Sequence, residues 1–350
     1  MTIAGWPWNC PRWELGARRC RVIGISSLCM RMERHVSLLV SLLAPLMLGS
    51  GDADSPSVTT PKGADLAAET SRADAAVQSA LATQKFASGP RLEGVTYGLV
   101  GDAKTDNTEA LRKLLGDGNR TIDIAPGDYV TGSLRIPGNT VLLLDRGVTL
   151  RDSGHLGPND RLINIFEDNV VMRGPGARII ANRQDYTTGE QRHGVMIYGA
   201  SNVVIDGVES SGHGGDGFYI GSPAGKAPPH NIVLSHCLAS NNRRQGLSIT
   251  SGKEVIVADC TFQYTKGTAP QFGIDVEPGQ PKEALDHIVL LRPTTRGNHS
   301  GGISLYLDAL NGTDTPVDIQ VLGHVSRDEP VAFKPHGKSG PAWRLQYAAR

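Results

Sequence analysis

From about residue 120 onward, one polar residue followed by three apolar residues recurs along the chain. The copies read NTVLLL at 139, NVVM at 169, NVVI at 202, NIVL at 231, EVIV at 254, HIVL at 287 and DIQV at 318. Successive copies begin 23 to 33 residues apart. Short apolar segments at this spacing indicate a repeat architecture, in which each turn of chain stacks on the one before it.

A second series of apolar segments runs out of phase with the first. It reads GVMIY at 194, GFYIG at 217, GLSIT at 246, GIDVE at 273 and GISLY at 302, and VAFKPH at 331 continues it. The first and third positions after each glycine are apolar, while the position between them varies. This period of two places the apolar set in a core and the varying set on the outer face of strands.

Strands that recur without helical patterns between them predict an all-β fold, a single-stranded parallel β-helix or solenoid. An antiparallel sandwich is the alternative, but it requires hairpin turns about every 8 to 12 residues, and the turns here are not so regular. Asp106 followed by Glu109 fits a capping box that opens a short N-terminal capping helix. Residues 64–85 are rich in alanine and predict a second helix with a thin apolar face.

The N-terminal region has the layout of a secretory signal. The apolar run VSLLVSLLAPLML at 36–48 follows basic residues and precedes the small and polar GSGDADS. At thirteen residues it is shorter than the roughly twenty needed to span a bilayer. We therefore expect export to the periplasm or the medium, with the true start at Met30 or Met32. The expected divisions are 1–53 (upstream extension and signal), 54–93 (linker and alanine-rich helix), 94–338 (β-helix) and 339–350 (C-terminal tail).

Composition narrows the range of partners. The 35 basic residues balance the 35 acidic ones, so nothing points to nucleic acid or to a membrane surface. We expect a monomer without a membrane span once the signal is removed. Cys10, Cys20 and Cys29 fall in the leader. Cys237 and Cys260 occupy the same place in successive copies, and we expect buried, stacked thiols there.

The varying positions of the second series form an outward column when the turns are stacked. Its members are Met196, Tyr219, Ser248, Asp275, Ser304 and Lys334, and a neighbouring column holds Tyr198, Thr250, Glu277, Tyr306 and His336. Stacked strands lie about 4.8 Å apart, so these side chains should meet. Rings and charges on one wall are typical of a sugar-binding face.

The stretch QFGIDVEPG, residues 271–279, places two acids on this wall. We expect the carboxylates of Asp275 and Glu277 to face solvent, about 7 Å apart along the strand. Two acids on one outer face repel each other unless a cation or a substrate uses them. Their oxygens suit Ca²⁺, and they also suit the acid and base of a glycoside hydrolase, for which a gap of about 6.5 to 9.5 Å indicates inversion.

The stretches YGLVGDAKTDNTEAL and IDIAPGDYVTGSLRIPGNTVLLLDRGVTL resemble the opening of the pectin-lyase-like superfamily of right-handed parallel β-helices, and the likeness covers roughly residues 94–338. In the polygalacturonases of that superfamily, the first catalytic aspartate would fall on Asp216. Their paired aspartates would fall on Arg244 and Gln245, so that constellation is incomplete here. Fold alone does not fix chemistry.

The pectate lyases of the superfamily imply a different chemistry, in which acidic residues bind calcium beside an arginine that removes the proton at C5 of a uronate. By this analogy Asp275 and Glu277 bind calcium, Arg243 or Arg244 is the base, and Tyr219 or Tyr306 protonates the leaving oxygen. The resulting hypothesis is an exported enzyme that cleaves or modifies an acidic, uronate-containing polysaccharide by β-elimination. A glycoside hydrolase, an epimerase and a non-catalytic glycan-binding β-helix stay open as alternatives.

The candidate residues divide by role. The catalytic candidates are Arg243, Arg244, Asp275, Glu277 and Tyr306. The substrate-binding candidates are Tyr198, His213, Asp216, Tyr219 and Lys334. Asp275 and Glu277 are also the candidate calcium ligands, and we expect no other cofactor.

Overall fold

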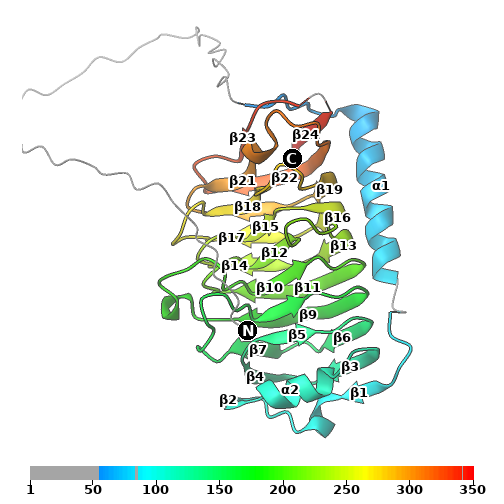
Figure 1. Cartoon of the computed structure of the whole chain (residues 1–350), viewed down its shortest axis with the longest axis vertical. Coiled ribbons are helices and arrows are strands. Elements are labelled where there is room, and N and C mark those ends of the chain that lie inside the picture. Colours follow the sequence, from blue (N-terminus) through cyan, green and yellow to red (C-terminus); the bar gives the residue numbers. More distant parts are fainter. Residues whose placement is uncertain (1–54, 83–85, 341) are drawn as a thin grey trace, which may run out of the picture. The chain divides into compact units, whose positions relative to one another are not determined.

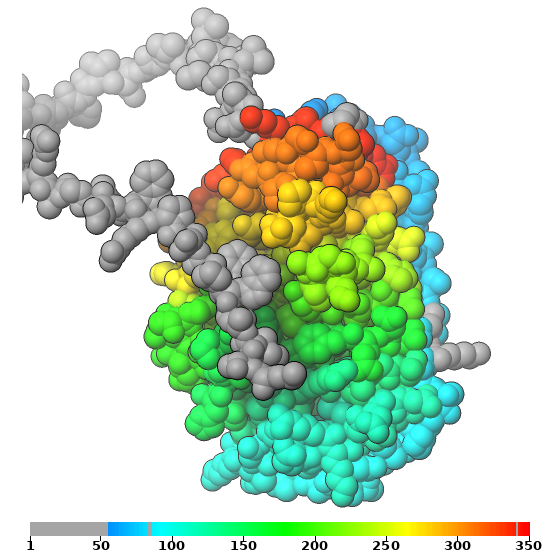
Figure 2. All heavy atoms as spheres, in the orientation of Figure 1, coloured from blue at the N-terminus to red at the C-terminus, as the bar shows by residue number. Residues whose placement is uncertain are grey.

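The computed structural model describes residues 55–82, 86–340 and 342–350. These residues form a parallel β-helix whose two sheets face each other across an apolar core (Figure 1). In the space-filling view the turns appear as colour bands stacked from cyan to red (Figure 2). The predicted signal, both candidate start sites and Cys10, Cys20 and Cys29 lie outside the described residues.

One sheet has eight parallel strands, and we call it the site sheet. Its strands are β5 (Leu134–Ile136), β8 (Ile163–Ile165), β10 (Val195–Tyr198), β12 (Phe218–Gly221), β15 (Leu247–Ile249), β18 (Phe272–Val276), β21 (Gly301–Tyr306) and β23 (Phe333–His336). The six segments of the second series form β10, β12, β15, β18, β21 and β23, which confirms their prediction as stacked strands.

The larger sheet has 16 strands and supplies the other walls of the solenoid. They are β1 (Arg91–Glu93), β2 (Asp102–Asp106), β3 (Arg120–Ile124), β4 (Gly127–Thr131), β6 (Thr140–Leu144), β7 (Val148–Asp152), β9 (Val170–Ile180), β11 (Val203–Ser211), β13 (His230–Ser235), β14 (Leu238–Ser240), β16 (Gly252–Ala258), β17 (Thr261–Gln263), β19 (Leu285–Leu291), β20 (Thr294–Arg296), β22 (Val317–Arg327) and β24 (Trp343–Ala349). The first series forms β6, β9, β11, β13, β16, β19 and β22, as predicted. The solenoid extends beyond the expected 94–338, because β1 pairs with β3 and the expected tail supplies β24, which pairs with β22.

An asparagine ladder explains why a polar residue precedes each apolar triplet. Asn139, Asn169, Asn202 and Asn231 all adopt left-handed backbone angles, with φ from 53° to 64°. Asparagine tolerates this conformation better than most residues with a side chain. The side-chain amides of Asn169, Asn202 and Asn231 each donate to the asparagine of the preceding turn, at 2.8 to 2.9 Å. The ladder therefore fixes the turns at the starts of β6, β9, β11 and β13 of the large sheet.

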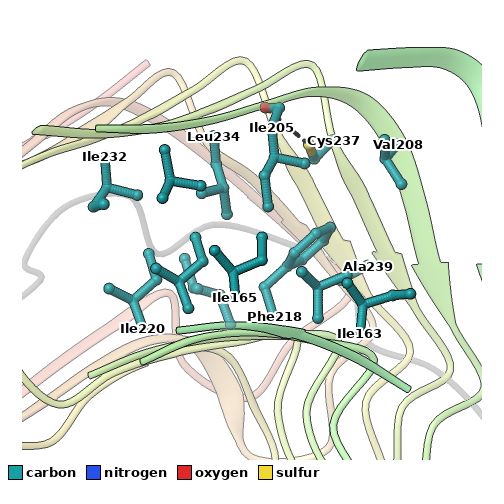
Figure 3. Packing of buried hydrophobic residues seen from close by; sticks show 14 of the residues in the cluster. Ile163, Ile165, Ile205, Val208, Phe218, Ile220, Ile232, Leu234, Cys237 and Ala239 are labelled. Carbon is teal, nitrogen blue, oxygen red and sulfur yellow. Dashed lines mark hydrogen bonds between the residues drawn. The ribbon is translucent and has the colours of Figure 1, made fainter. Parts of the chain in front are cut away.

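The core is filled by the inward residues of both sheets. Figure 3 shows Ile163, Ile165 and Phe218 of the site sheet facing Ile205 and Leu234 of the large sheet. Cys237 and Cys260 are buried free thiols, as predicted, and the amide of Cys237 donates to Cys260 Sγ at 3.3 Å. A core of this kind fixes which side chains of each strand point outward.

Helix α2 (Thr108–Leu115) caps the N-terminal end of the solenoid, with Leu111, Leu114 and Leu115 buried. The helix begins one residue later than the capping-box prediction, since Asn107 is its N-cap; Asp106 instead accepts a hydrogen bond from the Thr108 amide at 2.8 Å. Short 3-10 turns are η1 (Gly94–Tyr97), η2 (Arg183–Asp185) and η3 (Asp308–Leu310).

Helix α1 (Gly63–Ala82) crosses several turns of the large sheet, contacting β11, β13, β16 and β19 (Figure 1). Its buried Ala73 and Val77 pack in a cluster with outward apolar residues of that sheet. Arg292 of the neighbouring turn pairs with Asp74 at 2.7 Å. Within the described residues, neither helix is long and apolar enough to cross a membrane.

Candidate functional site

The outer face of the site sheet carries both predicted columns in register. Met196, Tyr219, Ser248, Asp275, Ser304 and Lys334 are consecutive strand partners. Tyr306 pairs with His336 in the neighbouring column. Side chains that are far apart in the sequence are therefore one strand spacing apart in space, because the strands are parallel and unshifted along this face.

A cleft of about 600 Å³ opens over β18, β21 and β23. Asp275 and Glu277 lie at its wall, with Ser304, Lys334 and His336. The Tyr306 ring is stacked on the His336 ring at 4.8 Å and is 43% exposed. A stacked pair of nearly parallel rings, with the tyrosine ring partly exposed beside charged groups, offers a platform for a sugar ring.

Asp275 is fully buried, so the expectation that its carboxylate faces solvent is wrong. Its Oδ2 accepts a hydrogen bond from Gln245 Nε2 at 2.8 Å. Its Oδ1 has no hydrogen-bond partner among the described residues. Burial, reinforced by the negative charge of Glu277, raises the pKa of Asp275 to about 8. At neutral pH this group therefore carries a proton at the wall of the cleft.

Arg244 contacts three carboxylates and one hydroxyl group. Its Nη1 donates to Asp216 Oδ2 at 3.2 Å and to Ser248 Oγ at 3.1 Å. Its Nη2 donates to Glu277 Oε2 at 3.3 Å, and its Nε lies 3.4 Å from Glu190 Oε2. Burial alone would lower the pKa of this guanidinium, but the surrounding carboxylates raise it above its ordinary value. Arg244 therefore stays charged, which does not suit the base role expected for it.

Asp216 lies behind Arg244, is fully buried and, unlike Asp275, does not line the cleft, so it is not placed to touch a substrate as predicted. Its carboxylate pairs with Arg244, and its backbone amide donates to His193 Nδ1 at 3.0 Å. Burial raises the pKa of Asp216, while Arg244 counters this. Its role is to anchor the guanidinium from behind.

The two tyrosines predicted to bind substrate lie near this cluster. Tyr219 stacks on His193 at 4.9 Å, and its hydroxyl lies 3.1 Å from Thr250 Oγ1. Tyr198 packs against Tyr219 with the ring centroids 6.2 Å apart. The structure thus brings these aromatic rings to the same wall as Arg244, one and two strands away from it.

Two predicted residues do not join the site. His213 is fully buried, and its Nε2–H donates to the carbonyl oxygen of Ile179 at 3.0 Å; burial lowers its pKa to about 4. It is a neutral histidine of the interior. Arg243 points away from Arg244, and its guanidinium donates to the carbonyl oxygens of Thr187 and Gly189. It secures the loop that follows η2.

Three contributors were missed. The sequence marks Gln245 only as the place of a missing aspartate, yet its side chain donates to Asp275 and accepts a hydrogen bond from the Phe272 amide at 2.6 Å. Its position directly before the repeat glycine was the available signal. Glu190 comes from an irregular loop, and no repeat pattern identifies it. Arg161 precedes β8, and its position near the tyrosines follows only from coordinates.

The acidic pair does not fit the expected calcium ion. The Arg244 cation lies 3.3 Å from the Glu277 carboxylate, and Asp275 is protonated near neutral pH. Ca²⁺ requires about six to eight oxygen ligands, of which several carry charge. Among the described residues, the one group of three or more close metal-binding side chains is Asp286, His287 and Asp318 on the large sheet. No catalytic step is therefore derived through calcium.

Comparison with known proteins bears on the fold. The family described as "Right handed beta helix region" matches residues 168–307. The N-terminal fragment of bacteriophage phi29 gene product 12 superposes with a TM-score of 0.54 at 17% identity, over 69% of this chain and 43% of that one. The chain is a right-handed parallel β-helix, the fold that the resemblance to the pectin-lyase-like superfamily implied. A family 28 exopolygalacturonase of Yersinia enterocolitica has the same fold, with a TM-score of 0.51 at 15% identity over 73% of this chain and 65% of that one.

The proteins related to this chain in sequence include bacterial and phage proteins. The uncharacterized protein YclG of Bacillus subtilis (strain 168) is 28% identical over 63% of this β-helix chain and 44% of its own length. The pre-neck appendage protein of Bacillus phage B103 is 26% identical over 66% of this chain and 28% of its own length. This chain thus spans less than half the length of the curated relatives it matches. These likenesses show the fold and leave the chemistry to the site.

Proposed function

We propose that this protein is a polysaccharide-active enzyme that cleaves an acidic, uronate-containing glycan in the cleft beside Asp275. The observation that carries the proposal is the buried, protonated carboxyl of Asp275, with one oxygen lacking a partner among the described residues, at the wall of a cleft. A carboxyl whose pKa is raised to about 8 is suited to donate a proton at neutral pH.

Hydrolysis is the reaction that this geometry supports best. Asp275 gives its proton to the glycosidic oxygen as the bond from that oxygen to the anomeric carbon breaks. A water molecule adds to the anomeric carbon, and its proton passes to the carboxylate of Glu277. Arg244 holds Glu277 in place at 3.3 Å. Lys334, one strand beyond Ser304, offers a positive charge for a uronate carboxylate.

β-Elimination is the second candidate, because two cations lie on the wall that holds Asp275. Arg244 and Lys334 are placed to neutralise a uronate carboxylate, which makes the C5 proton more acidic. The charged state of Arg244 weighs against its acting as the base. In this reaction the Glu277 carboxylate takes the C5 proton, a double bond forms between C4 and C5, and Asp275 protonates the oxygen that leaves C4, so both candidates depend on the same two carboxyl groups.

The test is a screen of the purified protein on uronate-containing and neutral polysaccharides. New reducing ends without absorbance from an unsaturated uronate indicate hydrolysis, whereas both signals together indicate elimination. Asp275→Asn should lower the rate by about 10²- to 10⁴-fold. Asp286→Asn, on β19 of the large sheet, is the matched control and should keep the wild-type rate. Binding without turnover on every uronan would overturn the proposal and favour a glycan-binding appendage.

A further inference from the structure

A second cavity lies on the site sheet at the N-terminal end of the solenoid. It has a volume of about 680 Å³ and is lined by side chains of α2, β5, β8 and the segments around them. Arg112, Arg135 and Arg161 contribute guanidinium groups to it, and Phe166 contributes a ring that is 41% exposed. It shares no lining residue with the cleft over Asp275.

The arginines of this cavity differ in their partners. Arg112 pairs with Glu109 at 2.7 Å, and Arg135 pairs with Glu167. Among the described residues, Arg161 has no carboxylate partner within 4.0 Å. Its Nη2 donates to the neutral Gln191 Oε1 at 2.7 Å, and its buried Nε has no hydrogen-bond partner among those residues. The charge of Asp160, which also lines the cavity, acts on Arg161 without forming an ion pair with it. A partly desolvated guanidinium that no carboxylate pairs with directly is a receptor for an anion.

Arg161 also lies on the route from this cavity to the cleft. Tyr219 and Tyr198 interact electrostatically with Arg161. Burial lowers the pKa of His193, and the charge of Arg161 adds to this effect more than that of Arg244. Asn164 of β8 lines the cavity and is connected to Asp275 by successive strand partners. These are Met196, Tyr219 and Ser248. Four strand spacings make this path about 19 Å long.

We propose that this cavity is a distal glycan subsite, in which Arg161 binds an anionic sugar of the same chain whose cleavable bond lies beside Asp275. This inference rests on the proposed function, because it assumes that a single glycan lies along the outward column of the solenoid and reaches both cavities. The anion is a carboxylate or a sulfate ester, which a guanidinium recognises in the same way. Phe166 gives the sugar ring an apolar surface to lie on.

A glycan that fills both cavities gains binding energy far from the reacting bond. Such energy holds the reacting sugar in position against Asp275 and is lost when the chain is too short. Oligouronates long enough to reach both cavities should therefore bind much more tightly than oligouronates that fill the cleft alone.

The experiment measures binding by calorimetry to the Asp275→Asn protein, which under the proposed mechanism turns over the ligand about 10²- to 10⁴-fold more slowly than the wild type. Adding Arg161→Met should weaken binding of long oligouronates by about ten- to a hundredfold, the loss expected for a hydrogen bond to a charged group. Binding of short oligouronates should not change. Arg146→Met, at an exposed position outside both cavities, is the matched control and should bind long chains as before.

Further ligands and a second variant identify the anionic group and test the subsite independently of Arg161. If Arg161→Met weakens binding of a long sulfated oligosaccharide but not of a long oligouronate, the subsite binds a sulfate ester. If it weakens binding of the oligouronate but not of the sulfated chain, the subsite binds a carboxylate. Affinity for a long neutral chain should be unaffected. Phe166→Ala, at an exposed position, should also weaken binding of the long chain. Equal affinities for all anionic chains with and without the Arg161→Met substitution would overturn the subsite.

The outcomes also separate this inference from the proposed function. If no polysaccharide is cleaved but Arg161→Met still weakens binding of the long chain, the enzyme proposal fails and the subsite stands. If cleavage depends on Asp275 but Arg161→Met changes neither binding nor rate, the subsite fails and the enzyme proposal stands.

Discussion

Gln245 Nε2 donates a hydrogen bond of 2.8 Å to Asp275 Oδ2 from the neighbouring strand. The contact is buried on both sides, and it stabilises the charged form of a carboxyl that burial keeps neutral. Gln245 therefore limits how far the pKa of Asp275 rises. It stands where a polygalacturonase would carry an aspartate, so the substitution replaces a second charge by a neutral donor.

Removal of this hydrogen bond should raise the pKa of Asp275 further above about 8. We expect Gln245→Met to move the alkaline limb of the pH–rate profile for polysaccharide cleavage to higher pH. The variant also leaves the Phe272 amide without its acceptor, which costs about 1 to 3 kcal/mol of stability. Gln263→Met on β17 is the control, and it should leave the alkaline limb of the pH–rate profile at the wild-type pH. A limb that moves to lower pH contradicts the role assigned to Gln245.

The protonation of Asp275 also predicts how stability depends on pH. The folded state binds its proton up to about pH 8, whereas the unfolded chain releases it near the ordinary value of about 4. Stability from this group is therefore fully present below about pH 4, falls as the pH rises towards 8, and is level above that. Thermal unfolding of Asp275→Asn should show a flatter slope over this range and a higher Tm at pH 8 than the wild type. Asp286→Asn should keep the wild-type slope.

The architecture was predictable because it depends on local patterns that every turn repeats. The apolar triplet after Asn169 or Asn202 and the alternation in GIDVE each define a strand, and parallel stacking then places Asp275 beside Ser248 and Ser304. The composition of the wall follows from this register. The prediction of export stays a prediction, as does the monomeric state.

The depth of each side chain was not predictable in the same way. An outward position on a strand does not show whether a loop or a neighbouring long side chain covers it. Asp275 is outward in register and yet buried, because Gln245, Glu277 and Ser304 surround it. Arg243 and Arg244 are adjacent in sequence, but Arg243 donates to a loop carbonyl, that of Thr187, whereas Arg244 donates to Glu277 at the cleft wall.

Arg244 should contribute more to the free energy of unfolding than an ordinary surface arginine does. Its side chain is 15% exposed, and its loss leaves the buried carboxylate of Asp216 without its cation. We expect Arg244→Gln to lower the free energy of unfolding by about 3 to 5 kcal/mol. Arg344→Gln, which breaks an exposed pair with Asp318, should cost about 1 kcal/mol or less.

A double-mutant cycle tests whether the stability lost in Arg244→Gln comes from the buried Asp216 carboxylate being left unpaired. Asp216→Asn combined with Arg244→Gln should recover most of the stability lost in Arg244→Gln. Additive losses in denaturant unfolding would show that the two side chains do not act as a pair.

Calcium should not matter to this site. The guanidinium of Arg244 already neutralises Glu277, and Asp275 offers a neutral carboxyl near pH 7. We expect a chelator to change neither the Tm nor the rate of polysaccharide cleavage, and added Ca²⁺ to have no effect. A rise in Tm with Ca²⁺ that Glu277→Gln abolishes would restore the calcium hypothesis.

The asparagine ladder makes a prediction about the fold itself. Asn202 has φ of 56°, donates to Asn169 and accepts from Asn231. Asn202→Ala should cost about 2 to 4 kcal/mol, because the left-handed backbone costs about 1 to 2 kcal/mol and each lost hydrogen bond adds about 1 kcal/mol. Asn202→Gly loses the same hydrogen bonds but adopts this φ without strain, so it should cost less than the alanine variant. Denaturant unfolding of the two variants measures the difference, and equal costs would show that the hydrogen bonds alone account for asparagine at this turn.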